Sequence, residues 1–183
     1  MIESFLVILD IGISLLTLGA IVWSIKFPEK SLWPPKTYTM WTPYIIWPPT
    51  FVLFGTIIAL GVMGWGQISI PVFIKYGIGI LLILVGNGIV WFEVFKFGVA
   101  QTGGAVGKLK TDGLYRFTRN PQYVGDILMI IGWMLVSAAP FAMLVGMFAI
   151  TVLIAAPFSE EPWLKKYYGA DYENYFKATR RFI

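Results

Sequence analysis

The sequence contains no cysteine and no histidine. The absence of cysteine excludes disulfides and thiolate nucleophiles, and without either residue type the usual ligand sets for zinc and haem cannot form. The absence of histidine also removes the side chain that most often acts as a general base near neutral pH. We therefore expect no metal centre.

Charged residues are also scarce. They make up 13% of the 183 residues, against about a quarter in a soluble domain. Hydrophobic residues make up 57%, and the mean hydropathy is +0.73. A chain this apolar cannot cover a water-facing surface, so lipid must cover part of it. We expect one all-α membrane domain over residues 1–183, with no room for a second soluble domain.

Five apolar runs predict a polytopic bundle of about five transmembrane helices. A spanning helix needs about 20 apolar residues, and the first three runs reach this length. The last two are shorter and flank Ala139-Pro140, so they predict a tight helical hairpin that need not cross the whole bilayer. The first run ends in Lys26 rather than in a small-residue cleavage site, which favours an anchor over a signal peptide. The runs cover residues 5–25, 44–63, 72–92, 123–138 and 141–158.

Positive charge is confined to three segments. Thirteen of the 14 lysines and arginines fall in residues 26–42, 93–122 and 159–183, and only Lys75 lies elsewhere. Five crossings would place all three segments on one side of the membrane. The positive-inside rule predicts that this side is cytoplasmic and that the N-terminus lies outside. Within the second segment, the Gly-rich residues 101–107 are interpreted as a loop.

Aromatic residues near the ends of the apolar runs are typical of the belt at the lipid headgroups. They are Trp33, Trp41, Trp47 and Trp65. In the tail, Pro162 after Glu160-Glu161 suits the first turn of a new helix. A stripe of aromatic residues predicts that this helix is amphipathic and cytosolic, lying on the membrane or on the bundle. The stripe consists of Tyr168, Tyr172, Tyr175 and Phe176.

Three polar motifs could carry chemistry, and each has a structural alternative. Gly86-Asn87-Gly88 would let a ligand approach the third run, or would pack helices together. Arg119-Asn120-Pro121 would open a helix whose free N–H groups suit a carboxylate or phosphate, or would contact lipid phosphates. Glu160-Glu161 would hold a cation or act as a base, or would cap a helix, with Glu161 pairing to a lysine four residues on.

Taken together, the motifs resemble the superfamily of phospholipid N-methyltransferases and isoprenylcysteine carboxyl methyltransferases, over about residues 86–183. Gly-x-Gly, Asn-Pro-x-Tyr-x-Gly and Glu-Glu-Pro are matched at residues 86–88, 120–125 and 160–162. Gly132-Trp133 and Pro140 match the hairpin between the last two motifs. In the middle motif, Asn120 stands where the carboxyl methyltransferase branch usually has a histidine. The C-terminal tail of the chain, in contrast, is more similar to that branch.

This resemblance implies S-adenosylmethionine as the methyl donor. It implies that residues 71–183 form the catalytic half and that residues 1–70 mainly anchor the protein. Gly86 and Gly88 would admit the donor; Arg119, Asn120 and Tyr123 would hold its carboxylate and its ribose or adenine edges. Glu160 and Glu161 would meet its cationic groups, with Arg119 as a third catalytic residue. Tyr168 and Tyr172 would cover the adenine.

The acceptor implied by the resemblance is lipid-like: a phospholipid amine, a prenylcysteine carboxylate or a thiol, entering sideways from the membrane. No nucleic-acid partner is expected. Because histidine is absent, a proton would leave the acceptor to a carboxylate, to water or by the acceptor's own equilibrium.

Two alternatives remain open. Membrane sterol reductases, which use NADPH, carry Arg-x-Pro-x-Tyr-x-Gly-Asp, and residues 119–126 fit that pattern. Such an enzyme would need a site for the 2′-phosphate, for which Arg180 and Arg181 are candidates. The other alternative is a non-enzymatic membrane protein.

Overall fold

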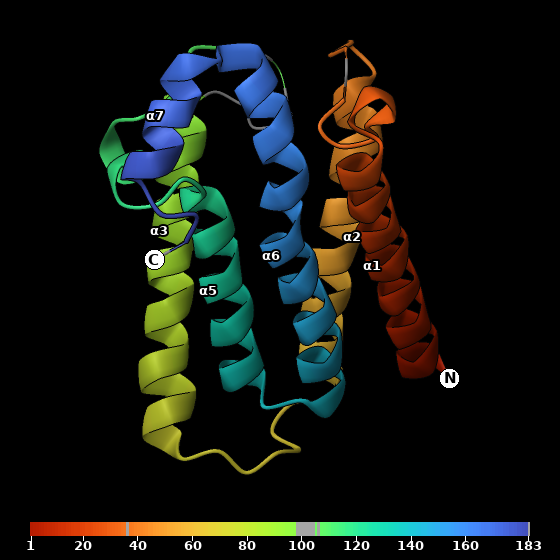
Figure 1. The fold of residues 1–183 in the computed structure, drawn as a ribbon. Helices are drawn as coiled ribbons and strands as arrows, with labels where there is room; N and C mark the ends of the chain where they lie inside the picture. Colours follow the sequence, from red (N-terminus) through yellow and green to blue (C-terminus); the bar gives the residue numbers. More distant parts are fainter. Residues whose placement is uncertain (36, 98–104, 106, 183) are drawn as a thin grey trace.

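The computed structural model describes residues 1–35, 37–97, 105 and 107–182, which form a helical bundle (Figure 1). The helices are α1 (Ile2–Lys26), α2 (Thr42–Met63), α3 (Gly79–Phe97), α5 (Pro121–Ser137), α6 (Pro140–Tyr168) and α7 (Ala170–Ala178). Short 3-10 turns lie at Pro28–Lys30 and Gly113–Arg116, and a π-helix at Phe73–Ile78 leads into α3. The predicted polytopic all-α bundle is confirmed.

Four helical segments are long and apolar enough to cross a membrane. They are Ile2–Lys26, Thr42–Met63, Phe73–Lys96 and Pro140–Tyr168. Helix α5 is apolar but has only 17 residues. At 1.5 Å per residue it is about 25 Å long, shorter than the roughly 30 Å hydrocarbon core. Its N-terminus therefore lies deeper in the bundle than the upper ends of α3 and α6 (Figure 1).

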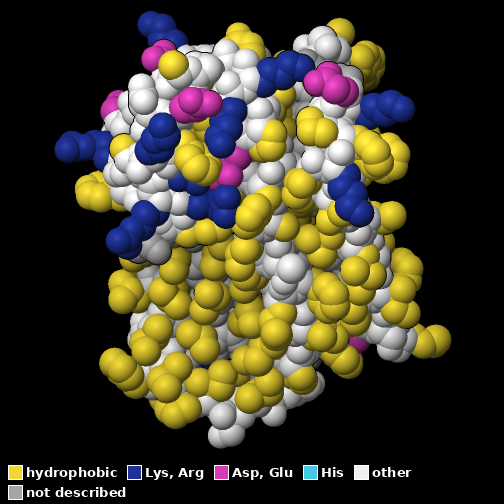
Figure 2. All heavy atoms as spheres, viewed as in Figure 1, with side chains coloured by type: hydrophobic (Ala, Val, Ile, Leu, Met, Phe, Trp, Pro, Cys, Tyr) yellow, Lys and Arg dark blue, Asp and Glu magenta, His cyan; other side chains and the backbone are white. Residues whose placement is uncertain are grey.

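Charged side chains gather at one end of the bundle. Successive long helices run in opposite directions, so the segments before α2, before α5 and after α6 meet at the same end (Figure 1). On the face shown in Figure 2, the visible lysines and arginines gather at this end, and a broad hydrophobic surface extends below them. Among the described residues, the three basic segments thus lie at the same end of the bundle, as five crossings would require. Lys36 and most of the Gly-rich segment 101–107 lie outside them.

The predicted start of a new helix at Glu160-Glu161 is wrong, although a separate C-terminal helix, α7, follows at Ala170–Ala178. Helix α6 continues through Pro157 and Pro162 and ends only at Gly169, which has a φ of +56°. The hairpin turn at Ala138 and Ala139 is tight as predicted, but its second helix is long enough to span a membrane. Proline fits both a first turn and a helix that continues with one hydrogen bond missing, and the sequence does not separate the two. The continuation carries both glutamates beyond the start of α5.

Helices α3 and α5 are held together by facing glycines. A Cβ atom on Gly132 would lie 2.6 Å from the carbonyl oxygen of Gly79, and one on Gly125 would lie 2.8 Å from that of Gly86. A Cβ on Gly86 would in turn collide with the Gly125 carbonyl oxygen. The absence of side chains allows this close approach, as is common between membrane helices. Gly86 therefore packs α3 against α5, which is one of the two possibilities that the sequence leaves open for this residue.

Replacing Gly86 by Ala is expected to lower the free energy of unfolding by about 1–3 kcal/mol, because the added methyl overpacks the α3–α5 contact. Gly88→Ala is the matched control, since a Cβ at Gly88 meets nothing within 4 Å. This control should be neutral or stabilising by up to about 1 kcal/mol, as expected for Gly→Ala in an open helix position. Thermal unfolding in detergent measures both. Equal losses in the two variants would contradict the packing.

Candidate functional site

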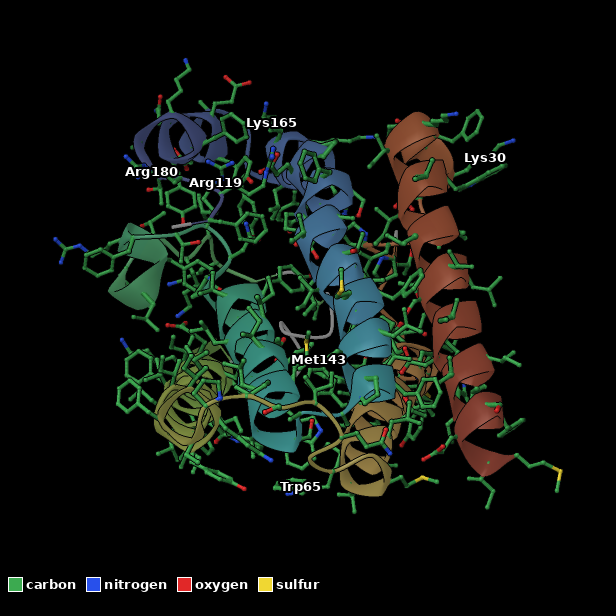
Figure 3. All side chains as sticks on the ribbon, turned by 90° about the horizontal axis from the view of Figure 1, so that it is seen from below. Lys30, Trp65, Arg119, Met143, Lys165 and Arg180 are labelled. Carbon is green, nitrogen blue, oxygen red and sulfur yellow. The ribbon has the colours of Figure 1, made fainter. Side chains whose placement is uncertain are left out.

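The C-terminal tail folds back over the recessed start of α5. The backbone N–H of Arg119 donates to the carbonyl of Arg180 at 2.8 Å. The Thr118 hydroxyl and the Asn120 side-chain amide both donate to the carbonyl of Arg181, each at 2.9 Å. Figure 3 shows Arg119 and Arg180 next to each other beside α7. Residues 118–120 therefore fix the backbone at Arg180 and Arg181.

A buried ion-pair triad secures the same contact. Glu161 on α6 accepts from Arg119 Nη2 at 2.7 Å, and from Arg181 through Nε at 2.8 Å and Nη2 at 2.7 Å. The Glu161 and Arg119 side chains are only 10% and 7% exposed. Arg119 Nη1 also donates to the carbonyls of Phe176, at 3.0 Å, and Thr179. Charge-assisted hydrogen bonds of this kind are stronger than neutral ones, so Glu161 and Arg119 tie α6 to α7 and the tail.

Electrostatics within the triad follow from these contacts. The hydrogen bond to Glu161 raises the pKa of the Arg181 guanidinium above its ordinary value, so this side chain remains charged. Aromatic faces support both arginines: the guanidinium of Arg119 lies 4.1 Å from the ring centre of Phe176, and that of Arg181 lies 3.8 Å from Phe158. Such cation–π contacts add to the attraction in a desolvated site.

Glu160, the neighbour of Glu161, has a different environment. Its Oε1 accepts from the indole N–H of Trp33 at 2.7 Å and from the hydroxyl of Tyr123. Both donors are neutral. In the part of the chain that the structure describes, no lysine or arginine forms an ion pair with Glu160. Its carboxyl group is therefore fixed in place by two hydrogen bonds, and no described cation lies in an ion pair with it.

A polar cavity of about 150 Å³ lies between the end of α6, α7, the segment before α5 and Trp33. Lys108 and Lys110 lie on its wall together with Glu160. Burial raises the pKa values of Tyr115, Tyr172 and Tyr175 well above the ordinary value for tyrosine, so these rings remain neutral phenols. The aromatic residues of the lining are Trp33, Tyr115, Tyr123, Trp163, Tyr168, Tyr172 and Tyr175.

Beside it lies a larger apolar cavity of about 690 Å³, lined by α1, α2, α5 and α6 and by the segment between α1 and α2. Most of its lining residues precede residue 70, so the N-terminal helices shape this cavity. Trp33, Gln122 and Tyr123 line both cavities. These three side chains form the boundary wall, and two of them hydrogen-bond to Glu160.

Seven of the nine residues expected to bind the cofactor lie on the polar cavity. They are Arg119, Asn120, Tyr123, Glu160, Glu161, Tyr168 and Tyr172. Gly86 and Gly88 do not line it: Gly86 is buried against α5, and Gly88 is exposed. The structure thus brings the middle and last motifs together and leaves the first one on the α3–α5 contact.

Several lining residues escape prediction from the sequence. Trp33 fits an aromatic belt equally well, and its partner Glu160 is 127 residues away. Lys108 and Lys110 look like ordinary members of a basic loop. Asp126, which faces the apolar cavity, belongs to a motif visible in the sequence, but only the cavity makes it a candidate site residue.

Among the described residues, no group of three or more acidic side chains is placed to hold a metal ion. The fold and the two cavities define a polytopic helical membrane protein in which a polar site adjoins an apolar one. The family described as phospholipid methyltransferase matches residues 74–171, more than half of the chain. The protein belongs to this family.

A second comparison points to a different enzyme class. The chain is 26% identical over 113 residues to steroid 5-alpha-reductase DET2 of Solanum lycopersicum. The match covers 60% of this chain but only 43% of that relative, so the chain spans less than half of its length. No solved structure matches the chain.

Proposed function

We propose that this protein is a methyltransferase that transfers the methyl group of S-adenosylmethionine to a lipid-like or hydrophobic acceptor in the membrane. The main support is the adjacency of the two cavities, with Glu160 at their boundary. A polar donor would occupy the polar cavity, and an apolar acceptor would reach the boundary wall from the lipid side. Membership of the phospholipid methyltransferase family supports the choice of donor.

The residues of the polar cavity fit this cofactor. S-adenosylmethionine carries a sulfonium and an ammonium group, and Glu160 offers a carboxylate that no described cation neutralises. The aromatic rings of Tyr168 and Tyr172 suit an adenine. Lys108 and Lys110 are better available for the carboxylate of the donor than Arg119, because both Nη atoms of Arg119 are already hydrogen-bonded.

Arg119, Asn120 and Glu161 then act as positioning residues. They hold the C-terminal tail and α7, which carries Tyr172, against the end of α6. When bound, S-adenosylmethionine supplies an electrophilic methyl group that a nucleophile attacks in line. The part played by the protein is to hold donor and acceptor in line and to exclude water at the boundary wall. On this proposal the charged end, with the polar cavity, faces the cytoplasm.

An NADPH-dependent reductase is the second candidate, and the match to the steroid reductase favours it. The two cavity lysines would suit a phosphate. Two arginines are the candidates for binding the 2′-phosphate. Arg181, however, hydrogen-bonds to Glu161, so of the two only the exposed Arg180 is available.

Ligand-dependent thermal stability separates the two candidates. The purified protein is titrated separately with S-adenosylmethionine, S-adenosylhomocysteine and NADPH. A ligand that binds only the folded state adds about 2.7 kcal/mol of stability at 100 times its dissociation constant. We expect both adenosyl compounds to raise the melting temperature and NADPH to leave it unchanged. Stabilisation by NADPH alone would assign the protein to the reductases.

A further inference from the structure

The apolar cavity contains a single acidic side chain. Asp126 on α5 is the one aspartate or glutamate among its lining residues. The two threonines of the lining are already satisfied, since Thr17 donates to Ile13 at 2.8 Å and Thr50 donates to Ile46 at 3.3 Å. Asp126, by contrast, has neither a hydrogen bond nor an ion pair with any residue that the structure describes.

A carboxylate in this position needs a partner. Burying an ionised or polar group without a hydrogen bond costs several kcal/mol, and ionisable side chains among membrane helices usually face a functional cavity. The described lining of this cavity includes no lysine or arginine. The protein therefore presents an uncompensated acid at the wall of an apolar space of about 690 Å³.

We propose that Asp126 binds the positively charged amine head of a hydrophobic molecule whose apolar body fills this cavity. Charge complementarity selects an amine over an alcohol or thiol, and it rejects a carboxylate. It also disfavours an aminophospholipid, whose phosphate would follow the amine into a cavity where no described residue offers a cation. The occupant is therefore a long-chain amine without a phosphate.

The position of Asp126 connects this occupant with the polar cavity. Asp126 follows Tyr123 by three residues, so the two share one face of α5 and differ by about 4.5 Å along its axis. Tyr123 lines both cavities and hydrogen-bonds to Glu160. An amine bound at Asp126 would lie one helical turn from the boundary wall. Identifying this amine as the methyl acceptor rests on the proposed function, whereas the binding itself does not.

Binding of simple amphiphiles tests the inference. The protein is placed in phosphatidylcholine nanodiscs, and the affinities of dodecylamine, dodecanol and dodecanoate are obtained from ligand-dependent thermal stabilisation. An alkylamine is protonated at neutral pH, as a lysine side chain is. We expect dodecylamine to bind at least about tenfold more tightly than dodecanol, with dodecanoate weakest; tenfold corresponds to about 1.4 kcal/mol. Equal affinities for the amine and the alcohol in the wild-type protein would overturn the proposal.

Two variants test whether the preference for the amine comes from the carboxylate of Asp126. Asp126→Asn removes the charge with little change of shape, so the preference for dodecylamine over dodecanol should disappear while dodecanol affinity stays the same. Asp171→Asn, an exposed position on α7, is the matched control and should keep the preference. A preference that persists in Asp126→Asn would refute the assignment. The wild-type order of affinities remains a test even if this variant fails to fold.

A competition experiment distinguishes a phosphate-free long-chain amine from an aminophospholipid as the occupant of the cavity. Dilauroyl phosphatidylethanolamine, added to the same nanodiscs, should not displace dodecylamine, and equal displacement would overturn the exclusion of phosphate. S-adenosylhomocysteine is titrated in parallel. If S-adenosylhomocysteine fails to bind while the preference for the amine persists and depends on Asp126, that result refutes the methyltransferase proposal and supports the amine site.

Discussion

Glu160→Gln is expected to weaken binding of S-adenosylmethionine by about two orders of magnitude while leaving the bundle folded. The glutamine amide oxygen can still accept from Trp33 and Tyr123, so the wall between the cavities should persist. The variant loses the negative charge that would face the cationic donor. Removing one partner of a desolvated charge pair costs about 2–5 kcal/mol, and about 2.7 kcal/mol corresponds to 100-fold in affinity.

Isothermal titration with S-adenosylmethionine measures this loss directly. Glu173→Gln provides the control, because Glu173 is an exposed glutamate on α7 at the same end of the molecule and does not line the polar cavity. It should bind the donor as the wild-type protein does. An unchanged dissociation constant in Glu160→Gln would remove Glu160 from the donor site.

Glu161→Gln is expected to lower the free energy of unfolding by about 3–5 kcal/mol, the usual cost of breaking a buried ion pair on one side. The carboxylate faces two guanidinium groups, and its replacement leaves both positive charges without a counter-charge. The tail should then detach and become cleavable by trypsin after Arg180. This differs from the expectation based on sequence alone, in which Glu161 contacts the cationic groups of the donor.

The matched control for this effect is Glu29→Gln. Glu29 pairs with Lys166 at 3.1 Å, but the two side chains are 82% and 74% exposed. Surface ion pairs contribute little, so no measurable loss of stability is expected. Thermal unfolding and limited trypsin digestion compare the variants. If Glu161→Gln proves as stable and as resistant to trypsin as Glu29→Gln, the ion-pair triad does not hold the tail.

Hydropathy alone predicts the membrane helices well. The run over residues 44–63 corresponds to α2, Thr42–Met63, and the run over residues 5–25 to α1, Ile2–Lys26. This works because the requirement for about 20 apolar residues is local and strong. The end of α6 could not be found in the same way, because Pro162 is compatible with either a helix start or a helix interior.

The candidate site was only partly predictable for a geometric reason. Successive residues on a helix point about 100° apart. In consequence, Glu160 and Glu161 share one motif but meet different partners, Trp33 and Tyr123 on one side and two arginines on the other. Two such steps, about 200°, separate Gly86, packed on α5, from Gly88, which is exposed. A motif identifies the residues, but the packing decides which of them lines the cavity.

On our proposal, the protein moves a methyl group from a polar donor to a membrane-borne acceptor. This transfer can be followed with S-adenosylmethionine tritiated in the methyl group. The purified protein is placed in nanodiscs made from a total membrane lipid extract supplemented with long-chain amines, prenylcysteine analogues and long-chain thiols. We predict that tritium passes into the organic extract with the wild-type protein and with Glu173→Gln, but not with Glu160→Gln. Label that stays entirely on the donor, although S-adenosylmethionine is bound and every acceptor class is present, would show that the protein is not such a methyltransferase.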